Sequence, residues 1–314
     1  MISILGDLIA DFSLRIPEFP VQAGDMTHVK YMELGPGGAT NVAIMLRHFG
    51  EQVACLGETG DDEFGEIVRE GLQTEGVDIS GVVVSEGSET PVAGVVVDKA
   101  GEPAYLGYRG DLAVKALTPE WRTNIQSSVA LFADGWADHD AVPEINLEGL
   151  KAAREAGVRT FFDPGPGNRE YDLEWHLEAL KHVDVLLATE AEANRLTGLA
   201  DPLNAALALL DHGPELIVVK RGVAGCVLFT RGQVQIAPGF PVEARDATGA
   251  GDSLDAAVIH GCLREMDLES LGTLANATGA AKVQKLGTGH NMPALEEVRA
   301  VLERYGRDGE GLLD

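Results

Sequence analysis

The chain has 314 residues, of which 45% are hydrophobic and 24% charged, as in soluble globular proteins with a large core. Its formal net charge of −26 argues against a nucleic-acid partner and against an anionic membrane, because both need a basic surface. A nucleotide ligand stays open, since a helix N-terminus, a few basic side chains and a divalent cation can make one cleft positive. The acid excess fits a salty habitat or a need for solubility.

The three cysteines, Cys55, Cys226 and Cys262, lie far apart in apolar runs. There is no CxxC pair or Cys/His cluster, so neither a disulfide framework nor a zinc site is indicated. We expect buried free thiols in a reducing cytoplasm. The N-terminus lacks a basic region, and no apolar run reaches membrane-spanning length, so we expect no signal or membrane segment.

The first half of the chain mixes strand, helix and hairpin signals. A buried strand is expected over 2–5 and another over 53–56, with helices over 42–49 and from Asp61 to about Thr74. Residues 12–34 suit irregular edge strands, and strand-like runs at 90–98 and 103–108 flank a hairpin turn, DKAGE. We interpret about 12–34 and 88–112 as one antiparallel β lid over the main sheet.

After Thr118 the strand–helix rhythm becomes regular. Strands are expected at 129–133, 158–162, 183–187, 215–219 and 225–229. Helices are expected at 144–156, 171–181, 190–197, 202–211, 249–264, 268–284 and 294–304. This alternation predicts an α/β fold, a doubly wound and mainly parallel sheet with helices on both faces. Without an internal repeat or linker, the chain is expected to be one domain, 1–314, that carries the lid.

One stretch organises the rest: DATGAGDSLDAA, which begins at Asp246. Its small residues, Gly249, Ala250 and Gly251, precede an apolar pattern of helical spacing. A helix N-terminus with small residues suits an anion, because its free N–H groups point outward. A carboxylate in that turn, Asp252, makes sense where an anion meets a proton acceptor, as in phosphoryl transfer to a hydroxyl. The alternative is a glycine-rich helix start with an Asp cap.

A second motif, GGATNVA from Gly37 to Ala43, is followed by Gly50 and Gly60. With both motifs, the chain resembles the ribokinase-like, PfkB-type carbohydrate kinases over essentially its full length. The resemblance implies a Rossmann-like three-layer fold and Asp252 as catalytic base. It makes Gly249, Ala250 and Gly251 the anion hole for the transferring phosphoryl group. It implies a sugar site that contains Asp11, Gly37, Gly38 and Asn41.

The resemblance also implies a nucleotide site and cation sites. KRGVAG is similar to the family's nucleotide loop, which assigns ATP to Lys220, Gly222, Gly225 and Asn276. Glu192 matches a glutamate associated with Mg²⁺ through water, although Thr189 stands where the family motif has Asn. A potassium ion is implied in loops that hold a monovalent cation largely through backbone carbonyls. Those loops align with Asp246, Thr248, Lys282, Lys285, Gly287 and Asn291.

Two arginines are further candidates. Arg109, in GYRGD, is placed to reach over the substrate, and kinases of keto-acid sugars carry a similar Tyr-Arg pair. Arg169 is placed to reach the γ-phosphate. The alternative for each is a solvated surface arginine. Asp138 to Asp140 reads as an exposed loop, because no third metal ligand has suitable spacing.

The sequence therefore predicts an ATP- and Mg²⁺-dependent kinase of a small sugar. The absence of a Walker A pattern and of GxGxxG after the first strand disfavours a P-loop kinase and a Rossmann dehydrogenase. No glutamate near Phe132 to Trp136 matches a ribokinase sugar contact, which disfavours ribose.

Two alternatives stay open. One is a nucleoside kinase of the same family, with Phe12, Tyr31 and Tyr108 as the few aromatic candidates for stacking on a base. The other is a non-catalytic sugar-binding regulator, which the GAGD loop argues against. An apolar lid face that includes Val92, Val95 and Val97 predicts a homodimer through the lid.

Overall fold

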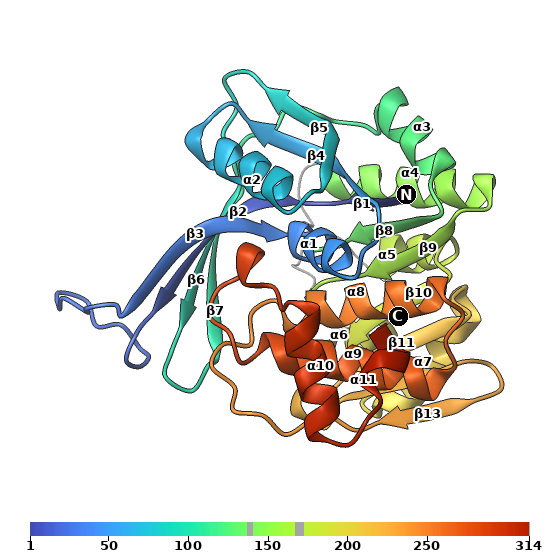
Figure 1. Cartoon of the computed structure of the whole chain (residues 1–314). Coiled ribbons are helices and arrows are strands. Elements are labelled where there is room, and N and C mark those ends of the chain that lie inside the picture. Colours follow the sequence, from blue (N-terminus) through green and yellow to red (C-terminus); the bar gives the residue numbers. More distant parts are fainter. Residues whose placement is uncertain (137–140, 167–172, 314) are drawn as a thin grey trace.

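The computed structural model describes residues 1–136, 141–166 and 173–313. These form a nine-stranded sheet in the order β13-β12-β11-β10-β9-β8-β1-β4-β5 (Figure 1). All neighbouring strands are parallel except β11 with β12 and β12 with β13. The strands are β1 Ile2–Leu5, β4 Val53–Gly60, β5 Asp78–Ser85, β8 Ala130–Asp134, β9 Arg159–Asp163, β10 Val185–Thr189, β11 Leu216–Lys220, β12 Cys226–Phe229 and β13 Val234–Ala237.

Helices cover both faces of this sheet, as the alternating pattern predicts. Side chains of α1, α2, α8, α9, α10 and α11 join the apolar core on one face, and those of α3 to α7 join the core on the other. The helices are α1 Thr40–His48, α2 Glu63–Thr74, α3 Pro119–Ser127, α4 Val142–Ala156, α5 Leu173–Leu180, α6 Glu190–Thr197, α7 Pro202–Leu209, α8 Ala250–Leu263, α9 Leu268–Lys282, α10 Leu295–Arg304 and α11 Gly309–Leu313.

The two cores explain why the central strands read as unbroken apolar runs. Phe161 and Phe162 are consecutive in β9, both fully buried, and belong to opposite cores. Successive side chains of a strand point to opposite faces, so a sheet covered on both faces needs apolar residues at every position. The sandwich of helices, sheet and helices confirms the expected doubly wound architecture.

A second sheet projects from the first, toward the left of Figure 1. Its strands, in the order β3-β2-β6-β7, are β2 Leu8–Arg15, β3 Tyr31–Gly38, β6 Val92–Val97 and β7 Pro103–Tyr108. We call these four strands the lid. The two outer pairings are antiparallel, as expected, but β2 pairs with β6 in parallel. Since β2 begins at Leu8, Asp11 lies within a lid strand and not in a turn after β1.

The expected apolar lid face is partly wrong in its residues. Val95 and Val97 are buried inside the chain, with 1% and 2% exposed, and are not available to a partner. The exposed apolar side chains of the lid lie on β3 and β7 instead, with Met32 65% and Leu106 68% exposed.

Four strands and helices were not expected from the sequence: β5, α3, β13 and α11. The strands β5 and β13 form the two edges of the large sheet and alternate only weakly between buried and exposed positions. Helix α3 is short, and only Trp121 and Ile125 are buried in it. Its start follows from local chemistry, because Thr118 accepts from the Trp121 N–H and Pro119 occupies the first turn.

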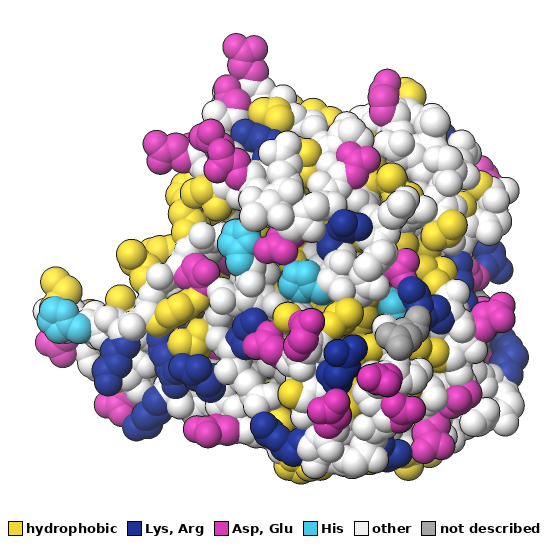
Figure 2. All heavy atoms as spheres, in the orientation of Figure 1, with side chains coloured by type: hydrophobic (Ala, Val, Ile, Leu, Met, Phe, Trp, Pro, Cys, Tyr) yellow, Lys and Arg dark blue, Asp and Glu magenta, His cyan; other side chains and the backbone are white. Residues whose placement is uncertain are grey.

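Asp and Glu side chains are spread over the face in Figure 2 and do not gather in one patch. The net charge of −26 is thus distributed over that surface. Among the described residues, no helix has the length and apolar character needed to cross a bilayer.

Candidate active site

The N-terminus of α8 presents unpaired backbone donors. Gly249 precedes the helix with φ 75°, a left-handed conformation that glycine adopts without strain. No side chain within the described part of the chain caps this helix. The first N–H groups of a helix have no partner inside it. That of Ala250 donates to the Ala247 carbonyl oxygen over 3.2 Å, so within the GAG motif the N–H of Gly251 is the one available to an anion. The arrangement fits the anion site that the sequence predicts.

Asp252 lies in the first turn of α8, half-buried, and a buried amide orients it. The Asn41 Nδ2 donates to Asp252 Oδ2 over 2.8 Å. Burial raises the pKa of Asp252 from 3.8 to about 6, the hydrogen bond from Asn41 lowers it, and the charge of Asp163 raises it. A carboxylate with a pKa of about 6 is still ionised at neutral pH and accepts a proton more readily than an ordinary Asp.

The same amide connects three elements. While its Nδ2 donates to Asp252 in α8, the Asn41 Oδ1 accepts from the Gly289 N–H over 3.0 Å. Asn41 itself is in the first turn of α1 and only 2% exposed. The amide is therefore a positioning group for Asp252. Its expected contact with a sugar stays a prediction.

Asp11 is buried close enough to Asp252 for the charges of the two carboxylates to interact. Its Oδ2 accepts from the Thr288 hydroxyl over 2.7 Å. Burial raises the pKa of Asp11 to about 7, Thr288 lowers it, and the charges of Asp252 and Asp246 raise it further. A buried carboxylate with one hydroxyl partner retains acceptor capacity for the hydroxyls of a ligand.

Glycine is required beside Asp11. A Cβ added at Gly37 would lie 2.1–2.4 Å from the Asp11 carboxyl group, which leaves no room for any side chain. Gly38 has φ 62°, and a Cβ there would lie 2.7 Å from the Asp7 carbonyl oxygen. The glycine pair of the first motif thus lets β3 approach β2 where Asp11 lies.

A residue of the lid that the sequence did not single out lies near these two carboxylates. The Tyr105 side chain is 48% exposed, yet its partial burial raises the pKa of the phenol, and the charges of Asp252 and Asp11 add to the rise. The Tyr105 ring also meets the Trp136 ring edge-on, with centroids 5.9 Å apart. Strand β7 therefore places an aromatic side chain near both candidate carboxylates.

Lys220 lies behind the anion site, in a buried ion-pair network. Its Nζ is 2.7 Å from Asp163 Oδ2 and 3.1 Å from Asp255 Oδ2. Burial alone would lower the pKa of Lys220, but those two carboxylates raise it well above its ordinary value. A Cβ at Gly251 would lie 3.7 Å from this Nζ. Lys220 thus supports the start of α8 from behind, and its expected contact with ATP stays a prediction.

The other residues expected to bind ATP converge on the chain after β13. Gly225 has φ 88°, and a Cβ there would lie 2.3 Å from the Ala237 carbonyl oxygen. Asn276, in α9, donates to the same oxygen over 2.9 Å. Gly222 has φ 53° in the exposed turn between β11 and β12. The structure brings Gly222, Gly225 and Asn276 to one region.

Glu192 caps a helix. Its Oε2 accepts from the Thr189 N–H over 2.7 Å, and the Thr189 hydroxyl accepts from the Glu192 N–H, a capping box at the start of α6. The departure from the family motif at Thr189 is therefore a helix cap. In the described part of the chain no cluster of three metal-ligating side chains exists. Magnesium fits this site only as an ion carried by nucleotide phosphates and waters, with Glu192 as an outer partner.

Three of the side chains aligned with a monovalent cation are already engaged by other groups of the protein. Asp246 accepts from the N–H groups of Thr248 and Gly287, over 2.9 and 2.8 Å. Lys285 pairs with Glu297 over 2.7 Å, and Asn291 donates to Glu33 over 2.6 Å. The fully buried Lys282 ammonium lies in the same region. These residues do not fit potassium, because a second cation would lie beside that ammonium.

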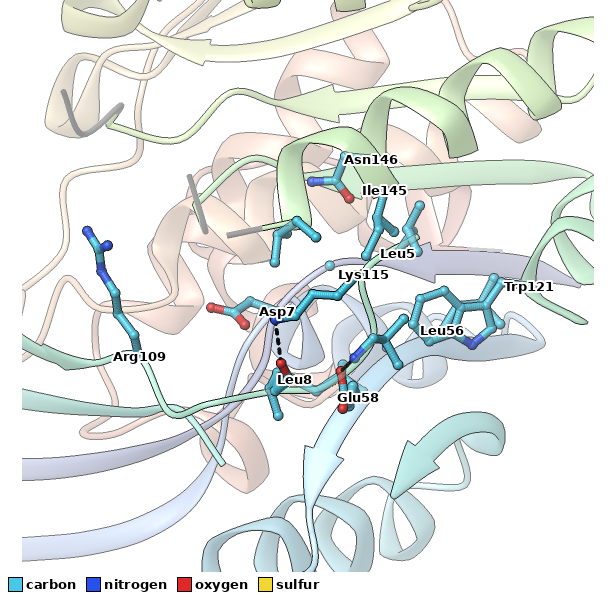
Figure 3. Close-up of a pocket in the computed structure, with 16 residues that line it drawn as sticks. Leu5, Asp7, Leu8, Leu56, Glu58, Arg109, Lys115, Trp121, Ile145 and Asn146 are labelled. Carbon is cyan, nitrogen blue, oxygen red and sulfur yellow. Dashed lines mark hydrogen bonds between the residues drawn. The ribbon is translucent and has the colours of Figure 1, made fainter. Parts of the chain in front are cut away.

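Arg109 lies at the end of the lid. It lines a pocket at the carboxyl ends of β1 and β4, together with Asp7, Glu58 and Lys115 (Figure 3). The pocket measures about 50 Å³, enough for a few water molecules and too small for a sugar. Arg169 and the 138–140 group lie outside the described residues.

The comparisons with known proteins agree with this geometry. A family model described as pfkB family carbohydrate kinase matches residues 1–295. The chain belongs to that family. The predicted carbohydrate kinase, with ATP-dependent phosphorylation of a sugar, is confirmed at this level.

Curated relatives of this pfkB family kinase match along its whole length. An ATP-dependent ribose-1-phosphate kinase of Halopiger xanaduensis is 33% identical over 298 residues, 94% of this chain and 96% of the relative. Fructokinase-1 of Zea mays is 30% identical, and the match covers 95% of this chain and 98% of the relative. Nucleoside kinases are also among the relatives. Arabidopsis thaliana ribokinase, solved with ribose and ATP, shares the fold with a TM-score of 0.81, 23% identity and coverage of 96% and 97%.

The sequence missed four side chains of the site: Tyr105, Asp163, Asp255 and Thr288. Two of them carried a signal, since Asp163 opens the DPGPGNR loop and Asp255 follows Asp252 by three residues in the same helix. Nothing local marks Tyr105 or Thr288, because their roles depend on tertiary contacts with distant carboxylates.

We expect Lys220→Met to destabilise the fold by about 3 kcal/mol, because Asp163 and Asp255 would remain buried without their cation. Urea unfolding at pH 8 measures this loss. A second change, Asp255→Leu, should recover part of the stability. Unchanged stability with weakened ATP binding would instead make Lys220 a nucleotide ligand.

We expect Asp11→Asn to stabilise the protein, and more so at pH 8 than at pH 5. The folded-state pKa of Asp11 is raised to about 7, so the wild type loses stability as pH rises from about 4 through 7. The uncharged variant escapes that loss. Thermal unfolding of both proteins across this range measures the difference, and a constant difference would contradict the raised pKa.

Proposed function

We propose that the protein transfers the γ-phosphoryl group of ATP to a hydroxyl of a small sugar, with Asp252 as the general base. The observation that carries this is the uncapped N-terminus of α8 beside a carboxylate that Asn41 orients. The hydroxyl proton passes to an Asp252 oxygen as the O–H bond breaks and the new O–P bond forms. ADP leaves as the bond to its β-phosphate oxygen breaks.

In this proposal, backbone N–H groups stabilise the negative charge that develops on the transferring phosphoryl group. The N–H groups of Gly249, Ala250 and Gly251 act as the anion hole for the phosphoryl oxygens. A bound Mg²⁺ would supply charge neutralisation at the phosphates, with Glu192 reached through water. The nucleotide lies along Gly222, Gly225 and Asn276, with Lys220 behind it.

The sugar occupies the side of the crevice that the lid forms. Asp11 and Asn41 accept and donate hydrogen bonds to hydroxyls, and Gly37 and Gly38 permit close approach. Tyr105 lies over the crevice from β7, and Arg109 lies at the lid's end. Closure of the lid on the sugar would exclude water and limit ATP hydrolysis. Arg169 is the candidate for the γ-phosphate.

We further propose that the acceptor sugar carries an anionic group. Two cationic side chains, Arg109 and Lys115, line the pocket at the end of the lid together with the carboxylates of Asp7 and Glu58, and Lys115 is exposed and can turn toward a ligand (Figure 3). The relative whose name specifies ribose 1-phosphate supports the same class. The Tyr105–Trp136 pair favours a second candidate, a nucleoside kinase, because aromatic rings suit a base.

A substrate panel tests these candidates. ADP release is measured with ribose, fructose, ribose 1-phosphate, a keto-acid sugar and nucleosides, each with Mg²⁺-ATP. We expect the highest kcat/KM for an anionic sugar. Turnover of nucleosides alone would make the protein a nucleoside kinase. Binding of a sugar with no turnover of any compound would favour the alternative that the protein is a non-catalytic sugar-binding regulator.

We expect Asp252→Asn to lower kcat by about a thousandfold or more while ATP and sugar still bind, because only the proton acceptor is lost. Calorimetry measures binding, and Asp211→Asn, a change at an exposed ion pair, is the control. The wild-type kcat/KM should fall as pH drops through about 6, where Asp252 gains a proton. Normal turnover of the variant would rule out Asp252 as base.

We also propose a homodimer through the lid, located in the cytoplasm. Exposed apolar side chains on β3 and β7, Met32 and Leu106 among them, support the dimer. Hydrophobic side chains are visible on the lid at the left of Figure 2. The three buried free cysteines fit a reducing compartment. Light scattering should give twice the chain mass, and a monomer would contradict the dimer.

A further inference from the structure

Lys282 is a buried lysine without a hydrogen-bond partner. It is the last residue of α9, has 0% exposure, and its Nζ makes no hydrogen bond within the described residues. It also has no ion pair within 4.0 Å there, unlike the buried Lys220. Fully buried lysines are rare and are usually paired, because desolvation of an ammonium is costly. A side chain that departs from this rule calls for a functional explanation.

The ammonium end of Lys282 lies beneath the start of α8. A Cβ at Gly249 would lie 3.2 Å from Lys282 Cε, 3.5 Å from Met292 Sδ and 3.6 Å from Thr288 Cγ2. The stem of Lys282 thus occupies the gap between the 246–249 turn and the 287–292 loop. Those are the two segments that the resemblance assigns to a monovalent cation.

Three carboxylates lie near enough to act on this ammonium through their charge, without hydrogen-bonding to it. Burial lowers the pKa of Lys282 and the charge of Lys285 adds to the fall, while the charges of Asp246, Asp252 and Asp11 oppose it and favour the protonated lysine. The oxygens of Asp246 accept from two backbone N–H groups, and Asp252 and Asp11 accept from Asn41 and Thr288. The lysine therefore contributes a charge to this region and is not a partner in a salt bridge.

We propose that the Lys282 ammonium is a resident monovalent cation, which takes the place of potassium in this protein. The proposal rests on the kinase function proposed above. An ammonium group and a potassium ion are both singly charged and of similar size. A fixed positive charge beneath the N-terminus of α8 adds to the helix dipole and stabilises negative charge on the transferring phosphoryl group. The Lys282 ammonium would then leave no space for a potassium ion in this gap, and its positive charge would repel one.

The first consequence is that the wild type needs no added monovalent cation. Its kcat with the best substrate of the panel should agree within twofold in potassium chloride and in choline chloride of equal ionic strength. Choline is too large to enter the gap. At equal ionic strength, a difference between the two salts therefore reports the binding of potassium in the gap. Activation by potassium of more than twofold over choline would overturn the proposal.

The second consequence concerns Lys282→Met, which removes the charge and ends one heavy atom short of the ammonium, so that the space of Nζ is vacated. In choline chloride we expect kcat to fall by at least about tenfold, in line with loss of one charge-stabilising group. Potassium or ammonium chloride should restore activity, whereas choline should not. Lys181→Met, the same change at an exposed ion pair just after α5, should keep wild-type activity in every salt.

A loss that no cation restores, in a folded Lys282→Met protein, would overturn the proposal, because the ammonium would then act through a direct contact. Thermal unfolding serves if this variant does not fold. The wild-type melting temperature should be the same in potassium and choline chloride, and a shift specific to potassium would contradict a filled site. Failure of the kinase assignment is recognised separately, since the wild type would then turn over no compound of the panel in either salt.

Discussion

The hydrogen bond from Asn41 to Asp252 is the contact on which the candidate site depends. It joins the first turn of α1 to the first turn of α8, and these residues are 211 positions apart in the chain. The two helices pack side by side on one face of the sheet, so the bond forms at the end of an apolar contact. The packing of both helices holds the Asn41 side chain in place, and the hydrogen bond from Asn41 orients the Asp252 carboxylate. The two sequence motifs are thus halves of one structure.

Charge is distributed unevenly between the surface and the crevice. The surface carries most of a net charge of −26, yet two lysines, Lys220 and Lys282, are buried around the start of α8. Buried charges interact through a medium of lower polarisability than water, so the two lysines and the helix N-terminus offset part of the negative charge of the buried carboxylates beside them, Asp163, Asp246 and Asp255. An acidic protein can therefore hold a nucleotide, provided that its few basic groups are placed inside.

Much of the fold could be predicted from the sequence, because covered parallel strands and their crossover helices leave clear apolar periods. The strands and helices β5, β13, α3 and α11 were not predicted because each buries few residues. The partners of the site residues were harder to predict than the positions of the helices and strands. Lys220 and Asn41 were expected to touch ligands, but the structure shows the first paired with Asp163 and Asp255 and the second with Asp252. Such pairings depend on distances between remote segments, which no local pattern encodes.

The segment that follows α9 has a consequence for the order of events in the crevice. Thr288 bonds to Asp11 of β2, and its neighbour Gly289 bonds to Asn41 of α1. Two adjacent residues of the C-terminal half therefore touch both the lid carboxylate and the amide that aims the base. A shift of this segment displaces both groups together. In the proposed reaction, occupancy of the acceptor side and alignment of Asp252 would be thermodynamically linked, so that each would favour the other to the same degree.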